Sequence, residues 1–334
     1  MPAVVIVGGF FGDEGKGKIV SYITLKDKVH TAVRGGVGPN AGHTVIYHGK
    51  TYKLRMLPSA IIGENTRLML GAGVLVNPSV LLDEVDKYDV WSRTMVDQMT
   101  CIIEERHLSA DKSGHLKETI GTTGTGTGPA NADRVLRIAK LAKDEPRLKG
   151  LMGDVAEEIN KVVDSGKRLL VEGTQGTFLS LYYGTYPYVT SKDVTASAIC
   201  SDVGLGPKKV DEVVMVCKSY VTRVGAGPME GEMSPEEAQK RGWQEFGTVT
   251  GRPRRAAPFS IKLAKRAAML NSATSIAITK FDILFPETAN QTDYTKLPAH
   301  AKKFVEDIEG EIGIPVTLIG TGAEVDSTID RRRN

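Results

Sequence analysis

A short apolar run that ends in a glycine-rich loop constrains the fold of this chain more than any other feature. The run AVVIV at residues 3–7 has the length and the branched side chains of a buried strand. It leads into GGFFGDEGKGK at residues 8–18, and KGKIVSYITL at residues 16–25 is typical of the start of a helix. A strand, a glycine-rich turn and a helix are the first half of a βα unit. The beginning of the chain therefore predicts an α/β protein.

Apolar runs and helical patterns alternate along the rest of the chain. Further strands are predicted at LMLGAGVLV, RLLVEGTQG, EVVMVCKSY and SIAITKFDIL. Helices are predicted at PSVLLDEVDKY, GLMGDVAEEINKVVDSG, SIKLAKRAAMLN and PAHAKKFVEDIEGEIG. This alternation predicts a P-loop-like α/β fold with a central, mostly parallel β-sheet flanked by helices and with inserted subdomain loops. No linker is evident, so we expect one domain over residues 1–334.

Composition argues against several classes of protein. The net charge is +3 with both signs mixed throughout, which does not favour nucleic acid as a partner. No apolar run approaches the about 18 residues of a membrane span, and the apolar start lacks the basic flank of a signal peptide. Cys101, Cys200 and Cys217 form no CxxC pair and are typical of reduced core residues in a cytoplasmic protein. The C-terminal arginines, residues 331–333, are expected to be a solvated tail.

The first loop has the register of a phosphate-binding loop but lacks its metal-binding hydroxyl. The spacing Gly-x4-Gly-Lys at residues 12–18 is that of a P-loop, yet Ile19 stands where Ser or Thr would hold Mg²⁺. Backbone N–H groups and the helix N-terminus could still bind phosphate, and Lys16 or Lys18 could neutralise it. Asp13 would then be an oxygen ligand of the metal. A tight turn with a solvated acidic pair is the alternative.

Two further loops are rich in glycine, and the first of them is too rich in glycine for a helix or a strand. RGGVGPNAGHT at residues 34–44 contains His43, which could titrate near neutrality and act as an acid. IGTTGTGTGPANADRVLR at residues 120–137 could wrap a second phosphate, with Arg137 one or two turns into the following helix. A surface histidine in a flexible loop and a Gly/Thr connector are the alternatives.

Three later stretches place polar side chains after predicted strands or in turns. VEGTQG puts Gln175 just after a strand, where its amide could bind a base or carbonyl edge, and GTYPYVTSKDVTAS contains Thr190. GTVTGRPRR at residues 247–255 packs three arginines into four residues, which favours a bound anion such as a carboxylate. A solvated basic turn is the alternative.

The segment SIAITKFDIL ends a predicted strand with Lys280 and Asp282. An aspartate there could accept hydrogen bonds from guanine N1–H and N2–H, while Lys280 lies along the base. Adenine offers no such donor pair, and an unpaired buried carboxylate costs on the order of 1–3 kcal/mol or more. An N-terminal helix cap is the alternative role for this aspartate.

Together these motifs resemble one family, the adenylosuccinate synthetases. GDEGKGK, NAGHT, IGTTGTGTGPA, VEGTQG, GTYPYVTS, TRVGAGP, VTGRPRR and TKFD follow one another in the order of that family, and the chain has the short length of its archaeal forms. The resemblance implies GTP-dependent ligation of IMP and L-aspartate to adenylosuccinate, GDP and phosphate through a 6-phosphoryl-IMP intermediate. It also implies Mg²⁺, a homodimer and a cytoplasmic location, with small-molecule substrates and neither nucleic acid nor membrane as partner.

The resemblance assigns roles residue by residue. Asp13 resembles the general base that takes the N1 proton of IMP, and it would ligate Mg²⁺ together with the carbonyl of Gly42. His43 resembles the acid that assists phosphoryl transfer, and Lys16 and Gln175 complete the catalytic set. GTP contacts match Gly12, Asp13, Glu14, Gly15, Lys16, Gly17, Lys18, Gly42, His43, Thr44, Arg254, Lys280, Phe281, Asp282, Gly320, Thr321 and Gly322. IMP contacts match Asp13, Lys16, Asn40, Ala41, Gly42, His43, Thr123, Arg137, Gln175, Thr190 and Arg252, and aspartate contacts match Thr248, Val249, Thr250, Gly251, Arg252 and Arg254. Arg137 matches an arginine that reaches the IMP of the neighbouring subunit.

The chain departs from the family pattern at three places. Phe10-Phe11 replace Gln-Trp, Ala256-Ala257 replace Gly-Trp, and the guanine wall usually written Ser-Thr-Gly-Pro is Gly-Thr-Gly-Ala at residues 320–323, so one hydroxyl contact is lost. A related phage branch joins aspartate to dGMP but typically has serine in place of the loop aspartate. Asp13 therefore favours IMP, with (d)GMP as the alternative. A non-catalytic GTP-binding switch is the second alternative, which the arginine cluster disfavours.

Overall fold

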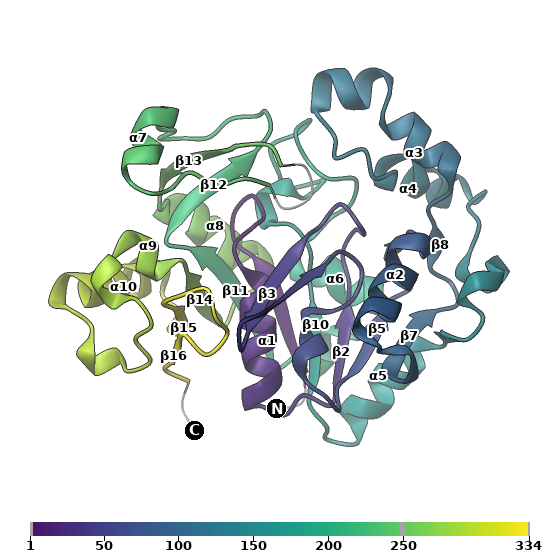
Figure 1. Cartoon of the computed structure of the whole chain (residues 1–334), viewed down its shortest axis with the longest axis horizontal. Helices are drawn as coiled ribbons and strands as arrows, with labels where there is room; N and C mark the ends of the chain where they lie inside the picture. The colour runs from purple at the N-terminus through teal and green to yellow at the C-terminus, as the bar shows by residue number, and fades with distance from the viewer. Residues whose placement is uncertain (1–2, 248–250, 333–334) are drawn as a thin grey trace.

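The computed structural model, which describes residues 3–247 and 251–332, is built around one ten-stranded sheet (Figure 1). The strands lie in the order β16-β15-β14-β11-β1-β10-β2-β5-β7-β9, and every neighbouring pair is parallel except β15–β16 at one edge. This confirms the predicted mostly parallel sheet. The strands span Ala3–Gly8 (β1), Thr31–Arg34 (β2), Arg67–Leu70 (β5), Thr94–Asp97 (β7), Met152–Gly153 (β9), Leu169–Glu172 (β10), Glu212–Lys218 (β11), Ser275–Thr279 (β14), Val316–Gly320 (β15) and Thr328–Asp330 (β16).

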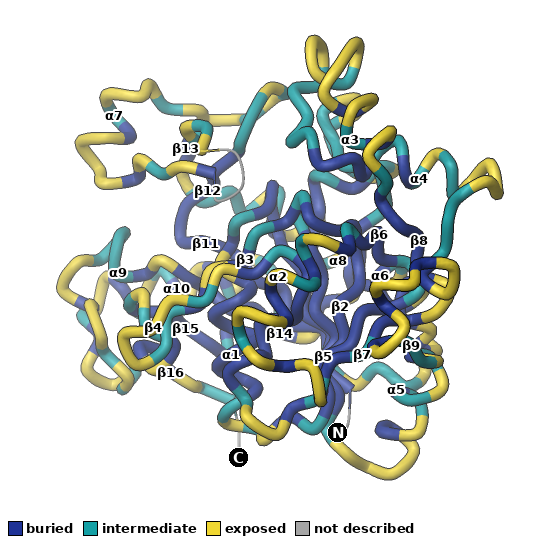
Figure 2. The backbone as a smooth tube through the Cα atoms, turned by 45° about the vertical axis from the view of Figure 1, so that its right-hand side comes forward, coloured by how far each residue is buried: buried dark blue, intermediate teal, exposed yellow. Residues whose placement is uncertain are grey.

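Helices cover both faces of the sheet, which explains why its strands are continuous apolar runs. Along β1, Val5 and Val7 pack into one core while Val4 and Ile6 pack into the other. The first core also holds residues of α5, α6, α8 and α10, and the second holds residues of α1 and α2. These helices span Lys16–Lys26 (α1), Pro78–Tyr88 (α2), Val155–Asp164 (α5), Ala196–Val203 (α6), Ile261–Asn271 (α8) and Ala299–Ile312 (α10). Figure 2 shows the strands as a continuous buried centre.

The remaining elements are insertions and connections around this sheet. In Figure 1, α3 and α4 stand at the upper right and β12, β13 and α7 at the upper left, beyond the carboxyl end of β1. The elements span His43–Tyr47 (β3), Lys50–Leu54 (β4), Leu75–Val76 (β6), Cys101–Ile102 (β8), Glu105–Asp111 (α3), Thr127–Leu136 (α4), Tyr220–Val224 (β12), Pro235–Lys240 (α7), Arg254–Pro258 (β13) and Phe281–Leu284 (α9). Short helical turns span Ser59–Ile62, Trp91–Arg93, Leu116–Ile120, Ala142–Asp144, Pro146–Leu148, Thr177–Leu179, Pro207–Lys209, Pro286–Thr288 and Tyr294–Lys296.

Several boundaries differ from the sequence-based expectation. His43, expected in a loop, begins β3, and the strand predicted at SIAITKFDIL ends at Thr279 before α9. LMLGAGVLV forms two strands because the chain turns at Gly71, where an added side chain would meet the backbone of Asp202 at 2.6 Å. The helix expected from residue 150 begins only at Val155, because Asp154 caps it by accepting the N–H of Glu157. Arg137, expected inside a helix, instead follows the last residue of α4 in a left-handed conformation with φ 65°.

Arg331 and Arg332 do not form the solvated tail that the sequence suggested. Arg331 pairs with Glu309 at 2.8 Å, and Arg332 pairs with Asp330 at 2.7 Å and with Asp27 at 3.0 Å. These ion pairs fasten residues 331–332 to α10 and to the end of α1. Arg333 lies outside the described residues.

Two composition-based expectations can be compared with the structure. Cys101, Cys200 and Cys217 are all free and buried, as expected. Within residues 3–247 and 251–332, no helix is long and apolar enough to cross a membrane.

We expect Ile278→Ala to lower the free energy of unfolding by about 2–5 kcal/mol, because it leaves a cavity in the core beside a central strand. Ile278 lies in β14 with 0% exposure. Met269→Ala, at a position of α8 that is 64% exposed, is the control and should change the value by less than about 0.5 kcal/mol. Urea denaturation measures both, and equal effects would contradict this description of the core.

Candidate active site

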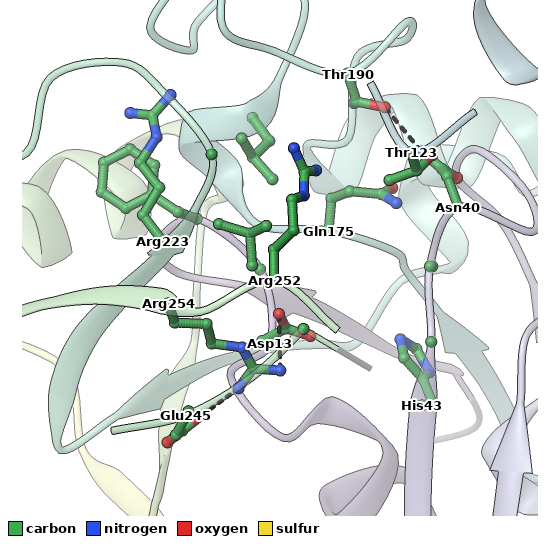
Figure 3. Close-up of a pocket in the computed structure, with 18 of the residues that line it drawn as sticks. Asp13, Asn40, His43, Thr123, Gln175, Thr190, Arg223, Glu245, Arg252 and Arg254 are labelled. Atoms are coloured by element: carbon green, nitrogen blue, oxygen red, sulfur yellow. Dashed lines mark hydrogen bonds and ion pairs between the residues drawn. The ribbon is translucent and has the colours of Figure 1, made fainter. Parts of the chain in front are cut away.

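The carboxyl ends of the strands border a cavity of about 820 Å³ (Figure 3). Its walls come from the loops after β1, β2, β10, β12, β14 and β15, and from the insertion that carries α3 and α4. Loops that follow parallel strands converge at one edge of the sheet, so a ligand there can contact segments far apart in the sequence. The cavity is large enough to hold several small polar groups at once.

This cavity collects most of the residues expected to bind substrates. Those that line it are Gly12, Asp13, Gly15, Lys16, Gly17, Lys18, Asn40, Ala41, Gly42, His43, Thr44, Thr123, Gln175, Thr190, Arg252, Arg254, Lys280, Asp282 and Gly322. Glu14, Arg137, Gly251, Phe281, Gly320 and Thr321 are not among its lining residues. Thr248, Val249 and Thr250 lie outside the described residues.

Glu14 acts inside the first loop and is not solvated. Its carboxylate accepts the N–H of Gly12 at 2.7 Å and the ammonium of Lys16 at 2.7 Å, and it is 1% exposed. Lys16 also donates to the carbonyl of Gln175. A side chain at Gly176 would meet the Glu14 carboxylate at 2.3 Å, so only glycine fits between the two loops. The alternative of a solvated acidic pair is therefore wrong for Glu14.

Asp13 projects into the cavity from a left-handed backbone position with φ 59°. Its Oδ2 lies 3.0 Å from Nη2 of Arg254, which enters from β13. Figure 3 shows the two side chains facing each other, joined by a dashed line. A carboxylate and a guanidinium held in contact here can exchange partners when substrates bring their own charges.

Glu245 holds Arg254 from the other side, and the sequence analysis missed it. Its carboxylate pairs with Arg254, accepts the hydroxyl of Tyr220 and lies 2.9 Å from Nζ of Lys218. Burial alone would raise the pKa of Glu245, but the charges of Lys218 and Arg254 and the hydroxyl of Tyr220 lower it to about 2. Glu245 therefore stays ionised and fixes the guanidinium. The only signal in the sequence was an acid just before the arginine cluster.

His43 is oriented by a second residue that the sequence analysis missed. Its Nδ1 donates to the carboxylate of Glu172, which ends β10. Burial and the nearby Arg34 charge lower the pKa of His43, against the opposing effect of Glu172. Burial would raise the pKa of Glu172, yet its contacts with His43, Arg34 and Ser59 bring it to about 2. Glu172 therefore stays ionised and holds one ring nitrogen of His43, which leaves the other nitrogen available to the cavity.

Arg223 closes one wall of the cavity, and it also escaped the sequence analysis. It donates to the carbonyl of Pro228 at 2.9 Å and to that of Tyr188 at 3.0 Å. Its guanidinium lies 4.6 Å from the centre of the ring of Phe11. Phe11 is one of the two phenylalanines that replace the Gln-Trp usual in the resembling family. Arg223 thereby ties the first loop to the loops that carry Thr190 and residues 225–228.

Further expected residues meet across the cavity. Asn40 donates to the hydroxyl of Thr190 at 3.3 Å, and its Oδ1 is buried without a partner among the described residues. Arg252 donates to the carbonyl of Gly121 at 2.8 Å, which joins the arginine cluster to the α3–α4 insertion. Figure 3 shows Gln175 and Thr123 on the same side as Asn40.

Asp282 does not cap a helix, which removes the alternative role considered for it. Lys280 is the residue that precedes α9, and Asp282 is the second residue inside that helix. The Oδ1 atom of Asp282 is buried and has no hydrogen-bond partner within the described part of the chain. A buried, unpartnered carboxylate oxygen at a cavity wall is a site for a ligand donor.

Comparisons with known proteins agree on one family. The family model described as adenylosuccinate synthetase matches residues 5–145 and 138–288. Adenylosuccinate synthetase of Methanocaldococcus jannaschii is 55% identical over 99% of this chain and 97% of that protein. The Archaeoglobus fulgidus protein of the same name is 54% identical over 100% of this chain and 99% of its own length.

Solved structures support the fold over the whole chain. The fully ligated adenylosuccinate synthetase from Plasmodium falciparum has a TM-score of 0.91 at 26% identity, covering 98% of this chain and 99% of its own. The succinoaminodeoxyadenylate synthetase of cyanophage S-2L, bound to dGMP and dATP, has a TM-score of 0.81 at 24% identity, covering 99% of this chain and 96% of its own. The phage enzyme therefore shares the fold.

We expect Glu172→Gln to lower the free energy of unfolding at neutral pH by about 3–5 kcal/mol, because it leaves the Arg34 charge buried without its counter-ion. The pKa of Glu172 falls from its ordinary 4.5 to about 2 in the folded chain. Its contribution is therefore present above pH 4.5 and is lost as the pH falls toward 2. Urea denaturation at a series of pH values should show the two proteins converging in acid.

Glu232→Gln is the matched control for this prediction, since Glu232 also pairs with an arginine, Arg255, but is 36% exposed. We expect it to change stability by no more than about 1 kcal/mol. A loss for Glu172→Gln that stays constant down to acid pH would show that charge is not the cause.

Proposed function

Because the chain belongs to the adenylosuccinate synthetase family, we propose that this cavity joins IMP to L-aspartate with hydrolysis of GTP. The products are adenylosuccinate, GDP and phosphate, a step of purine nucleotide synthesis. The observation that carries the proposal is the meeting of Asp13, Arg254, His43 and Asp282 around one cavity, although they come from four separate segments of the chain. A base, an anion-binding cation, an imidazole and an unpartnered carboxylate are the groups that this reaction needs.

Asp282 supports guanine as the base of the co-substrate. Its buried Oδ1 lacks a partner among the described residues, and guanine N1–H and N2–H would supply donors to the carboxylate. Lys280 lies beside it on the cavity wall and can cover the face of the base. Adenine would leave the carboxylate unsatisfied, which disfavours ATP.

We propose that Asp13 begins the chemistry. Its carboxylate takes the N1 proton of IMP, and the electron pair released makes the 6-oxygen a nucleophile toward the γ-phosphorus of GTP. The bond from that phosphorus to the β,γ-bridging oxygen breaks, GDP leaves and 6-phosphoryl-IMP forms. The amine of aspartate then attacks carbon 6, loses a proton, and phosphate departs. Gln175 and Lys16, on the same wall, hold the purine oxygen and the phosphates.

His43 assists the phosphoryl step through its free nitrogen. Burial and the charge of Arg34 lower the pKa of His43, which favours the neutral imidazole. The negative charge of a triphosphate favours the protonated form, which can donate to the moving phosphoryl oxygens. Glu172 fixes the ring so that this donor points at the substrate.

The arginine cluster supports L-aspartate as the acceptor. Arg252 and Arg254 both line the cavity, and guanidinium groups bind carboxylates in a two-point contact. Arg254 meets Asp13 at 3.0 Å, so the bound amino acid would lie next to the base and the 6-phosphoryl group. Gly251 belongs to the same sequence motif as Thr248, Val249 and Thr250, and we propose it as part of the aspartate site.

The donor set fits Mg²⁺ that is shared with GTP. Within residues 3–247 and 251–332, no group of three or more His, Cys, Asp or Glu side chains could hold a metal by itself. Asp13 and Gly42 both line the cavity, and Mg²⁺ is usually held by one or two protein oxygens together with substrate phosphates. When bound, Mg²⁺ would neutralise the charge of the phosphates.

Arg137 supports a homodimer because it lies outside the cavity of its own chain. It is exposed at the end of α4, between Leu136, which is 65% exposed, and Ile138, which is 64% exposed. Val135 beside them is 69% exposed. Exposed apolar residues gathered around one arginine are typical of a surface that a second copy covers, and Arg137 would then reach that copy's IMP.

Two further expectations stay proposals. We propose that residues 1–334 act as one domain, because strands from both ends of the chain belong to the same sheet. The three free, buried cysteines favour a cytoplasmic location.

We expect phosphate release to require GTP, Mg²⁺, IMP and L-aspartate together. Omitting one component at a time in a phosphate-release assay tests this. Phosphate release that does not depend on L-aspartate would contradict the ligase activity and favour a GTP-binding switch. Replacing IMP by dGMP in the same assay separates the two ligases, and equal or faster turnover with dGMP would contradict IMP as the substrate.

We expect Asp13→Ala and Arg137→Leu to be nearly inactive alone and to recover activity when mixed. A mixed dimer contains one site with both defects and one site with none, so a random mixture should reach about a quarter of wild-type activity. Retention of more than about a tenth of the rate by Asp13→Ala would contradict its role as base. Two inactive variants that stay inactive when mixed, despite forming mixed dimers by size and mass analysis, would contradict the role of Arg137.

A further inference from the structure

The ammonium group of Lys18 is held entirely by one turn of the backbone. It donates to the carbonyls of Gly322 at 2.6 Å, Glu324 at 2.8 Å and Ser327 at 2.7 Å. An ammonium group has three donors, so these carbonyls occupy all of them. Lys18 occupies the sequence position of the lysine in a phosphate-binding loop. Its three donors are already used, so this geometry does not favour the expected direct contact with phosphate.

The turn that Lys18 holds lies in the part of the cavity wall that is proposed to bind the guanine base. Gly322 and Ala323 line the wall, as do Lys280 and Asp282. The first pair follows β15 and the second follows β14, and these two strands are parallel neighbours, so their carboxyl ends lie side by side. A base bound to Asp282 would consequently lie next to the turn of residues 322–327.

The bond from Lys18 to Gly322 fixes the direction of the next N–H group. In a trans peptide the C=O of one residue and the N–H of the following residue point in opposite directions. The carbonyl of Glu324 faces Lys18, and the N–H of Val325 accordingly points away to the carbonyl of Ile46 at 2.9 Å.

By the same rule, the N–H of Ala323 points away from Lys18. No acceptor in the described part of the chain takes this N–H. Ala323 is exposed and borders the cavity, so a ligand or water is left to accept the hydrogen bond. This donor exists only because residue 323 is not proline, which is the residue usual in the resembling family and which has no N–H.

The two groups on this wall match the edge of one base. Guanine presents an acceptor, O6, next to two donors, N1–H and N2–H. A backbone N–H and a carboxylate present the complementary pattern, whereas the amino group of adenine would meet the N–H as donor against donor. The hydroxyl that the chain lacks at Gly320 would be replaced by this N–H.

We propose that Lys18 is a positioning residue for base selection, which orients the Gly322–Ala323 peptide so that the Ala323 N–H binds guanine O6 while Asp282 binds N1–H and N2–H. The inference rests on the proposed function, since it takes GTP as the co-substrate. It adds that the lysine of the phosphate-binding register sets which base is accepted.

Two variants test the proposal from its two ends. Lys18→Met removes the ammonium group, and Ala323→Pro removes the N–H without touching Lys18. For each, kcat and KM are measured with GTP and with ATP at saturating IMP and L-aspartate. We expect both variants to raise the KM for GTP and to lower the GTP-over-ATP ratio of kcat/KM by about tenfold or more, with kcat at saturating GTP within about threefold of wild type.

Matched controls separate these effects from general damage. Ala323→Gly keeps the N–H and should keep the preference for GTP. Lys26→Met makes the same change on the same helix, α1, at an exposed position and should behave as wild type. Circular dichroism and thermal melts show whether each variant folds, and if Lys18→Met does not, Ala323→Pro against Ala323→Gly decides the question alone.

A direct binding measurement distinguishes base selection from phosphate binding. By calorimetry, guanosine, which has no phosphate, should lose affinity for Lys18→Met, while tripolyphosphate should bind as it does to wild type. Equal losses with GTP and ATP, a loss of tripolyphosphate binding, or Ala323→Pro indistinguishable from Ala323→Gly would each overturn the proposal. A wild-type enzyme that uses GTP and ATP equally would overturn it and leave the ligase standing, whereas phosphate release independent of IMP or aspartate would remove the proposed function itself.

Discussion

A buried carboxylate, that of Glu14, keeps the first loop in the shape on which the cavity depends. It accepts backbone N–H groups of its own loop and the ammonium group of Lys16. Lys16 also donates to the carbonyl of Gln175, so the loops after β1 and β10 are fastened to each other. Gly176 allows the two loops to pack closely, because a side chain at this position would collide with the Glu14 carboxylate. With the inner side of the loop fixed in this way, Asp13 is left on the outer side, facing the cavity.

The same arrangement occurs at two other points of the cavity wall. Glu172 orients His43, and Glu245 orients Arg254, each by a carboxylate that stays ionised because cations and hydrogen bonds surround it. Burying charges costs desolvation energy, and such pairs often add little to net stability. Their benefit lies in holding functional groups in place before a substrate arrives, so that little reorganisation is needed during the reaction.

The elements and the cavity loops were predictable from the sequence to different degrees. Periodicity identified α2 and α8 because their buried faces repeat at regular spacing, and a continuous apolar run before a glycine-rich turn identified β1. The motifs pointed to Asp13 and His43 because they lie in glycine-rich loops, and to Asp282 because it follows a predicted strand. Glu172 and Glu245 were missed, since an acid at the end of a strand or inside a loop looks solvated until its partners, which lie far away in the sequence, are known.

The sequence by itself determined the α/β class, the order of the motifs and the presence of groups able to bind a nucleotide, because these follow from local pattern and residue type. Only the tertiary structure decided what each charged group does. Lys16 and Lys18 are two residues apart, yet one is held by Glu14 and the other by the turn after β15. A hydrogen bond forms only over a few ångströms, so the partner of each lysine depends on which distant segments the sheet brings together. The local sequence therefore cannot predict these partners.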